Sequence, residues 1–170
     1  MIIYVNLYDF IVKNSSRISE IKTQYIELLS ELTTCQDIST ELFMSNLQKI
    51  NISGQIIVGL NVPNLNGQEQ LNFPDISNIT SSFEIIGSGT IFIEPKIIHN
   101  AKSVGHIEDI VVKSSWRGKK ISSSILDKLK KIGQENNCYK IILDCNENVS
   151  GVYKSNGFDV KGIQMSLYLD

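Results

Sequence analysis

Hydrophobic positions along this chain follow two periods, and their succession predicts a mixed α/β fold. Runs of β-branched and aromatic residues predict strands at 2–10, 55–60, 83–93, 105–112, 139–143 and 158–169. Apolar residues at helical spacing predict helices at 18–32, 38–50 and 121–132, and a short one at 149–155. This order predicts a single mixed twisted sheet of about six strands, flanked by helices.

A long polar segment at 61–82 interrupts the pattern. It is rich in Asn, Ser, Pro and Gly, and it is longer than most loops in compact domains. We expect a loop insertion there, either a lid or an unstructured connection. The chain has no internal repeat, and 170 residues suit a single domain spanning 1–170.

Composition narrows the classes of protein. A hydrophobic content of 42% fits a globular protein, and a net charge of -2 with a pI near 5.7 lacks the basic excess of a nucleic-acid binder. No apolar run approaches the ~20 residues of a membrane span, and the N-terminus has no signal-peptide pattern. We therefore expect a cytoplasmic protein with neither a nucleic-acid nor a membrane partner.

Cysteines and histidines give little sign of metal or thiol chemistry. Cys35, Cys138 and Cys145 are odd in number and lack metal-ligand spacing, so we expect reduced thiols and no metal. His99 and His106 are the only histidines, and either is a conceivable general base or a structural residue. An acyl-enzyme on Cys145 is disfavoured, because no histidine is positioned by sequence to activate the thiol.

The strongest chemical signal is a strand at 105–112, a basic turn at Arg117 and Gly118, and a helix with Lys and Ser at its start. Free backbone N–H groups and the positive end of the helix dipole attract anions. This succession predicts a site for a phosphate-bearing cofactor. An ordinary basic helix start is the plainer alternative.

Two adjacent acids, Glu108 and Asp109, lie inside the apolar strand. Successive side chains of a strand point to opposite faces, so at least one acid is expected to be buried or to face a cleft. Such a carboxylate can accept the proton of an attacking amine, or it can cap a neighbouring loop.

Three segments carry a family resemblance: Lys96-Ile-Ile-His99, Gly105-His-Ile-Glu-Asp-Ile110 and Cys138-Tyr-Lys-Ile-Ile-Leu-Asp-Cys145. They resemble the glucosamine-6-phosphate N-acetyltransferases, a family of the GNAT acetyltransferase superfamily, from about Ser88 to Met165. The resemblance implies the GNAT fold, whose sheet is splayed between its two central parallel strands. It also implies an enzyme that moves acetyl from acetyl-CoA to the amine of glucosamine 6-phosphate by direct attack in a ternary complex. The product, N-acetylglucosamine 6-phosphate, serves UDP-N-acetylglucosamine biosynthesis.

The resemblance places the cofactor and the chemistry. It implies cofactor contacts at Ile110, Val111, Val112, Arg117, Gly118, Lys119, Lys120, Ile121, Ser122 and Ser123. Lys120 and Ser122 stand where glycines are expected in the family's pyrophosphate loop, and glycines allow close backbone approach to phosphate. The implied catalytic residues are Tyr153, Glu108 and Asp144. Tyr153 would protonate the departing thiolate, with a core tyrosine as the plainer alternative.

The resemblance also implies an acceptor site and a homodimer. The implied acceptor residues are Thr33, Lys96, Ile97, Ile98, His99, Glu108, Asp109, Tyr139, Lys140 and Tyr168. Family dimers share their sites through C-terminal segments, and Tyr168 stands roughly where the family's phosphate-binding arginine is expected. Two rival functions stay open: a GNAT acetyltransferase with another small amine substrate, and a non-catalytic acyl-CoA-binding module, which the altered loop favours.

Overall fold

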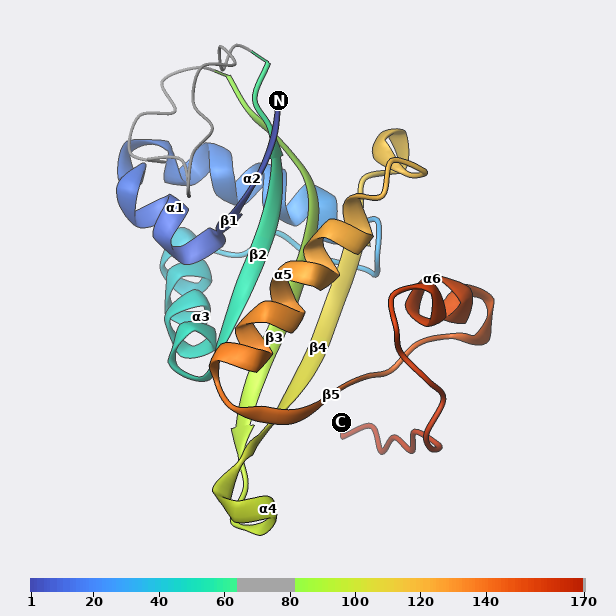
Figure 1. The fold of residues 1–170 in the computed structure, drawn as a ribbon. Helices are drawn as coiled ribbons and strands as arrows, with labels where there is room; N and C mark the ends of the chain where they lie inside the picture. The colour runs from blue at the N-terminus through green and yellow to red at the C-terminus, as the bar shows by residue number, and fades with distance from the viewer. Residues whose placement is uncertain (64–81, 170) are drawn as a thin grey trace.

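One five-stranded sheet organises the computed structural model, which describes residues 1–63 and 82–169 (Figure 1). The strands, in spatial order, are β1 (Ile2–Asn6), β2 (Gly54–Asn61), β3 (Glu84–Pro95), β4 (Ser103–Val112) and β5 (Cys138–Leu143). The first four pair antiparallel, and β5 runs parallel to β4. The predicted insertion at 61–82 falls mainly on 64–81, outside the described residues.

Helices cover both faces of the sheet. They are α1 (Leu7–Lys13), α2 (Ile18–Leu29), α3 (Thr40–Ser53), α4 (Ile98–Ala101), α5 (Ile121–Glu135) and α6 (Ser150–Ser155). The first three share one hydrophobic core with the sheet, and α5 builds a second core on the opposite face. Neighbouring residues of β2 divide between them, since Val58 joins the first core and Ile57 the second. The predicted mixed α/β fold is confirmed. No helix in the described part of the chain is long and apolar enough to cross a membrane.

The sixth predicted strand, at 158–169, is wrong, so the sheet has five strands instead of six. This segment lies outside the sheet, beyond α6 (Figure 1). Its apolar residues alternate as in a strand, but Ile163, Met165 and Leu167 are 93%, 92% and 85% exposed. A strand forms only where another strand pairs with its backbone, and the alternation alone does not supply that partner.

The predicted splay is present, but its position in the sheet differs. Pairing between β4 and β5 ends at Ile107 and Leu143, whereas β4 continues to Val112. The two parallel strands therefore separate beyond Ile107. Within the described residues β5 is the edge strand, because no sixth strand pairs with it, so the parallel pair lies at one side of the sheet and not at its centre.

The predicted first strand is too long, because a helix begins within it. Asn6 ends β1 and caps α1, accepting a hydrogen bond from the Asp9 backbone N–H at 3.1 Å. Leu7, Phe10 and Ile11 follow at helical spacing and are buried. The unbroken apolar run here is compatible with both the strand period and the helical period. The N-cap at Asn6 therefore determines where the strand ends and the helix begins.

Two glycines of β3, Gly87 and Gly89, face helix α5 and leave no room for a larger side chain. A Cβ atom built on Gly89 would lie 2.4 Å from the Ile110 side chain and 2.8 Å from that of Ile125. One built on Gly87 would lie 3.0 Å from both Ile121 and Ile125. The start of α5 is thereby held against the sheet, next to the end of β4.

Candidate active site

A bulge precedes the end of β4 where cofactor contacts are predicted. The pairing of β3 with β4 shifts between Ser88 and Thr90, and Asp109 has a left-handed φ of 53°. A bulge leaves backbone groups without ladder partners. Ile110 and Val112 then pack on the α5 side, and Val111 packs on the other.

The turn that follows presents backbone to a ligand. Gly118 has a φ of 77° with no atom near its Cβ position, so the chain is open there. Lys120 is left-handed too, with a φ of 59°, and caps α5 without a side-chain hydrogen bond. The first N–H groups of α5, at Ile121, Ser122 and Ser123, therefore have the geometry with which a helix start can bind an anion. The Ile121 side chain is buried, so only its backbone can serve.

A carboxylate from α2's C-terminal end holds this turn in place. Glu31 accepts hydrogen bonds from the Ser114 backbone N–H at 2.7 Å and from Arg117 Nη2 at 3.2 Å. Arg117 Nε also donates to the Val112 carbonyl at 3.1 Å. Arg117, a predicted cofactor residue, therefore uses two of its guanidinium nitrogens, Nε and Nη2, to stabilise the turn.

A second carboxylate supports the same turn from β3. Glu84 accepts from Lys113 Nζ at 2.6 Å and from Trp116 Nε1 at 3.2 Å. Lys119 Nζ lies 4.1 Å from the centroid of the Trp116 ring, within cation–π range. One basic side chain of the turn, that of Lys119, thus lies over an aromatic ring whose N–H donates to Glu84.

The predicted catalytic acids approach each other at the splay. Glu108 and Asp109 are both exposed, so the first of the two expected alternatives, a buried carboxylate, is wrong, whereas a carboxylate facing a cleft stays a prediction. Partial desolvation still raises the pKa of Glu108, and the charges of Asp109 and then Asp144 raise it further. A carboxylate with a raised pKa is a better proton acceptor from an amine.

Tyr153 lies half-buried on α6, in edge-to-face contact with Phe158 at 6.3 Å. Asn156 links this region to α5, because its side chain donates to Ser123 Oγ at 3.3 Å. Burial, and then the nearby Cys145, raises the pKa of Tyr153, so the phenol stays protonated at neutral pH. Its hydroxyl has no hydrogen-bond partner within the described residues, which leaves it available to a ligand.

One face of β3, β4 and β5 points away from α5 and is left partly uncovered. We call this surface the open face and define it by Phe92, Glu94, His106, Glu108, Lys140 and Ile142. The predicted acceptor residues Lys96 to His99 lie in the turn after β3, where His99 has a left-handed φ of 54°. The His99 ring contacts the Tyr139 ring at 4.2 Å, and Lys140 Nζ lies 5.6 Å from the same ring. The structure therefore brings these two predicted acceptor segments together.

Other predicted acceptor residues lie apart from this cluster. Ile97 and Ile98 are 96% and 62% exposed, so their side chains are largely in solvent. Thr33 follows α2, where its N–H donates to the Leu29 carbonyl at 3.2 Å. Tyr168 is 91% exposed in the C-terminal segment. Thr33 and Tyr168 are both exposed, and neither side chain has a hydrogen bond within the described residues.

Four residues near the site are not among the site residues that the sequence predicts. Glu31 and Glu84 reach the turn from positions 83 and 32 residues away from their partners, and no local pattern signals this. Glu94 and His106 meet at 2.8 Å across β3 and β4. The alternation of Glu94 with Lys96, and of His106 with Glu108, is the only signal that places them on one face.

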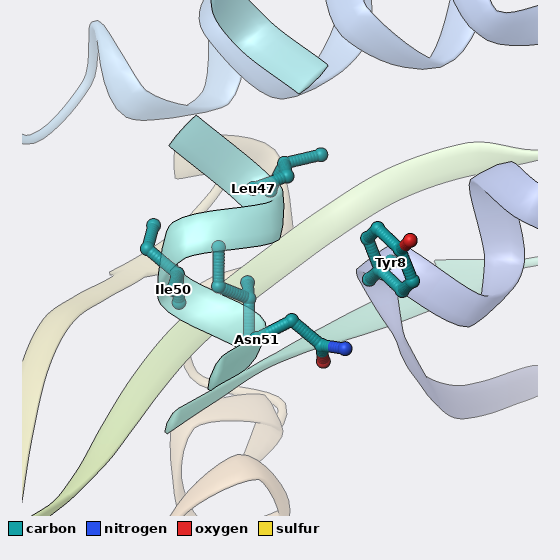
Figure 2. Close-up of a pocket in the computed structure, with 5 residues that line it drawn as sticks. Tyr8, Leu47, Ile50 and Asn51 are labelled. Carbon is teal, nitrogen blue, oxygen red and sulfur yellow. The ribbon is translucent and has the colours of Figure 1, made fainter. Parts of the chain in front are cut away.

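A depression between α1, α3 and β2 is no rival site (Figure 2). Tyr8, Leu47, Ile50 and Asn51 line it, together with Ile56. It has no room for a water molecule and none of the predicted site residues. Among the described residues, no group of three or more His, Cys, Asp or Glu side chains is arranged to hold a metal ion.

Comparison with known proteins agrees with this geometry. A protein-family model described as the acetyltransferase (GNAT) family matches residues 75–158, which include the bulged strand, the basic turn and Tyr153. The crystal structure of glucosamine-6-phosphate N-acetyltransferase from Arabidopsis thaliana superposes with a TM-score of 0.76 at 28% identity, covering 100% of this chain and 99% of that one. A Trypanosoma brucei acetyltransferase gives a TM-score of 0.74 at 26% identity, covering 99% and 100%. Fold and site thus define an acetyltransferase of the GNAT class.

Relatives found by sequence identify one family within the GNAT acetyltransferases. The glucosamine 6-phosphate N-acetyltransferase of Candida albicans is 33% identical over 149 residues, which are 88% of this chain and 89% of that protein. Glucosamine 6-phosphate N-acetyltransferase 1 of Dictyostelium discoideum is 49% identical over 86 residues, 51% of this chain and 55% of that protein. The chain belongs to the glucosamine 6-phosphate N-acetyltransferase family.

Proposed function

We propose that this protein transfers acetyl from acetyl-CoA to the amine of glucosamine 6-phosphate, giving N-acetylglucosamine 6-phosphate. The observation that carries the proposal is the polarity of the open face. Acids lie at the splay, where Glu108 and Asp144 interact, and lysines lie toward the other end, at Lys96 and Lys140. An amine and a phosphate at opposite ends of one sugar match this arrangement.

The donor site supports acetyl-CoA. The open backbone at Gly118 and the first N–H groups of α5 suit a pyrophosphate. The separation of β4 from β5 beyond Ile107 leaves room for the thioester arm between the strands. Lys120 keeps a left-handed conformation despite its side chain, so the altered loop retains the backbone shape that glycine favours.

The proposed reaction is direct attack of the amine on the thioester carbonyl. Glu108 accepts the amine proton, directly or through water, and its raised pKa suits that role. The Tyr153 hydroxyl donates its proton to the departing coenzyme A sulfur, on which negative charge develops. No covalent enzyme intermediate is required, and Cys145 is left without a role in the transfer.

Two measurements test the proposal. Calorimetric titration measures acetyl-CoA binding, and a thiol-release assay then compares glucosamine 6-phosphate, glucosamine and a panel of other amines. We expect the highest kcat/KM with glucosamine 6-phosphate, because the lysines favour a dianion. A preference for another amine would support a different acetyltransferase. Tight binding without thiol release for any amine would support a non-catalytic module.

We also propose that two copies form a homodimer through their C-terminal segments. Apolar side chains alternate along 163–169 and are almost fully exposed, at 85% to 93% for Ile163, Met165, Leu167 and Leu169. Such a pattern fits a strand completed by a second copy, which would also bring Tyr168 to the partner's acceptor phosphate. Light scattering should give the dimer mass. Met165→Asp with Leu167→Asp should give the monomer, and an unchanged mass would contradict this dimer.

The cellular setting proposed for this enzyme is the cytosol, in UDP-N-acetylglucosamine biosynthesis. Cys35, Cys138 and Cys145 are free thiols, as expected in a reducing compartment. Fractionation of cells that express the tagged protein would test the compartment.

A further inference from the structure

Glu94 holds two neighbours on the open face at once. Its Oε2 lies 2.8 Å from His106 Nε2, and its Oε1 accepts a hydrogen bond from Lys96 Nζ. The bond to Lys96 and then the bond to His106 hold the pKa of Glu94 below its usual value. The carboxylate is therefore charged when it orients the ring and the ammonium group.

His106 lies between the two ends of the open face. It is two residues before Glu108 in β4, and both point away from Ile107, which is buried under α5. Two strand residues span about 7 Å, a distance of the order of a hexose ring. An acceptor with its amine at Glu108 therefore has its far end over His106.

The surroundings of His106 leave its ring open to a ligand. Phe92 is its register partner on β3, and Ile142 is its partner on β5. Ile142 is 38% exposed, and the His106 side chain is 35% exposed, so each keeps about a third of its surface accessible. These two apolar neighbours offer no hydrogen bond that would compete for the ring.

Glu94 decides which nitrogen of His106 is available. When Nε2–H donates to the carboxylate, Nδ1 is the nitrogen left to face a ligand. An Nδ1–H in that position is a donor suited to phosphate oxygen. We propose that His106 is a further acceptor-binding residue, which donates Nδ1–H to the acceptor phosphate, and that Glu94 is the positioning residue that holds its ring. This inference rests on the proposed function.

His106→Phe tests the contact, since it keeps a ring and removes both nitrogens. Loss of one charge-assisted hydrogen bond should lower kcat/KM for glucosamine 6-phosphate by about 10- to 100-fold, mainly through KM. The kcat/KM for glucosamine should stay within about twofold, since it has no phosphate to lose. Acetyl-CoA affinity and thermal unfolding should not change. Equal losses with both sugars, or no loss with either, would overturn the contact.

Glu94→Gln tests the positioning role. It should raise KM for glucosamine 6-phosphate by about three- to tenfold with kcat retained, and its effect should shrink in the His106→Phe background. Glu135→Gln, which removes a surface carboxylate at the far end of α5, is the matched control. A lower KM in Glu94→Gln would mean that the carboxylate competes with phosphate for Lys96, and the positioning role would be wrong.

Wild-type kinetics separate this inference from the function on which it rests. A wild-type protein that does not acetylate glucosamine 6-phosphate overturns the proposed function and this assignment together. A wild-type protein that prefers glucosamine 6-phosphate, with the same preference in His106→Phe, overturns only the assignment.

Discussion

Replacing Tyr153 with Phe isolates the proposed leaving-group acid. The ring and its edge-to-face contact with Phe158 are kept, and the hydroxyl has no hydrogen bond to lose within the described residues. The thioester sulfur carries little charge before reaction and much more as its bond breaks. A hydroxyl aimed at the sulfur therefore acts mainly in the transition state.

We expect Tyr153→Phe to lower kcat by about 100-fold, at the lower end of what one positioned acid contributes. This loss corresponds to about 2.7 kcal/mol of transition-state stabilisation. The free energy of unfolding should change by less than about 0.5 kcal/mol, which shifts Tm by about 1–2 °C in a chain of this size. The affinity for acetyl-CoA should barely change.

The assay combines steady-state thiol release, calorimetry with acetyl-CoA and thermal unfolding on the same preparations. Tyr8→Phe is the control, because Tyr8 lies on α1 beside the depression in Figure 2. The reasoning would be refuted if Tyr153→Phe lost stability and acetyl-CoA affinity while turnover per folded molecule stayed intact. Tyr153 would then be a packing residue.

Three further predictions concern the acid and the turn. Because the fold raises the pKa of Glu108, its charged form is disfavoured, and stability from this group is lost as pH rises through that pKa. Glu108→Gln should therefore lower kcat/KM by at least about 100-fold and remove the acidic limb of its pH profile. At pH 8 this variant should resist unfolding by urea better than the wild type, and lower resistance would contradict the sign of the pKa shift. Gly118→Val, at a φ of 77°, should weaken acetyl-CoA binding in calorimetry by about tenfold or more, unlike the exposed control Gly162→Val; equal affinities would remove the pyrophosphate from this turn. Glu31→Gln, which loses its ion pair with Arg117, should weaken acetyl-CoA binding by about three- to tenfold; a changed Tm with unchanged affinity would make Glu31 purely structural.

Local sequence patterns predict most elements of the fold, because their periods match the faces that become buried. The helical period from Ile121 to Ile132 corresponds to α5, whose apolar residues fill the second core. The hydrophobic pattern does not show, however, which strands pair with each other. The alternation at 158–169 has the right period, but no strand among the described residues pairs with it.

The candidate site also has a part that the sequence predicts and a part that it does not. Residues adjacent in sequence, such as those of the basic turn, were predicted as a group because a helix start needs only local geometry. Glu31 and Glu84 could not be predicted, because they reach the turn through the tertiary fold. Glu94 and His106 come from different strands, so their contact depends on a register that the sequence does not state.

The glycine at position 89 ties the interior of the protein to ligand affinity. A methyl group there would overlap the side chains of Ile110 and Ile125, and a shift of α5 away from β3 is one way to relieve the overlap with Ile125. That shift would carry the helix start with it and misdirect the N–H groups offered to the pyrophosphate. If α5 binds the cofactor as proposed, substitution of Gly89 is constrained by cofactor recognition as well as by stability, although residue 89 need never touch the cofactor.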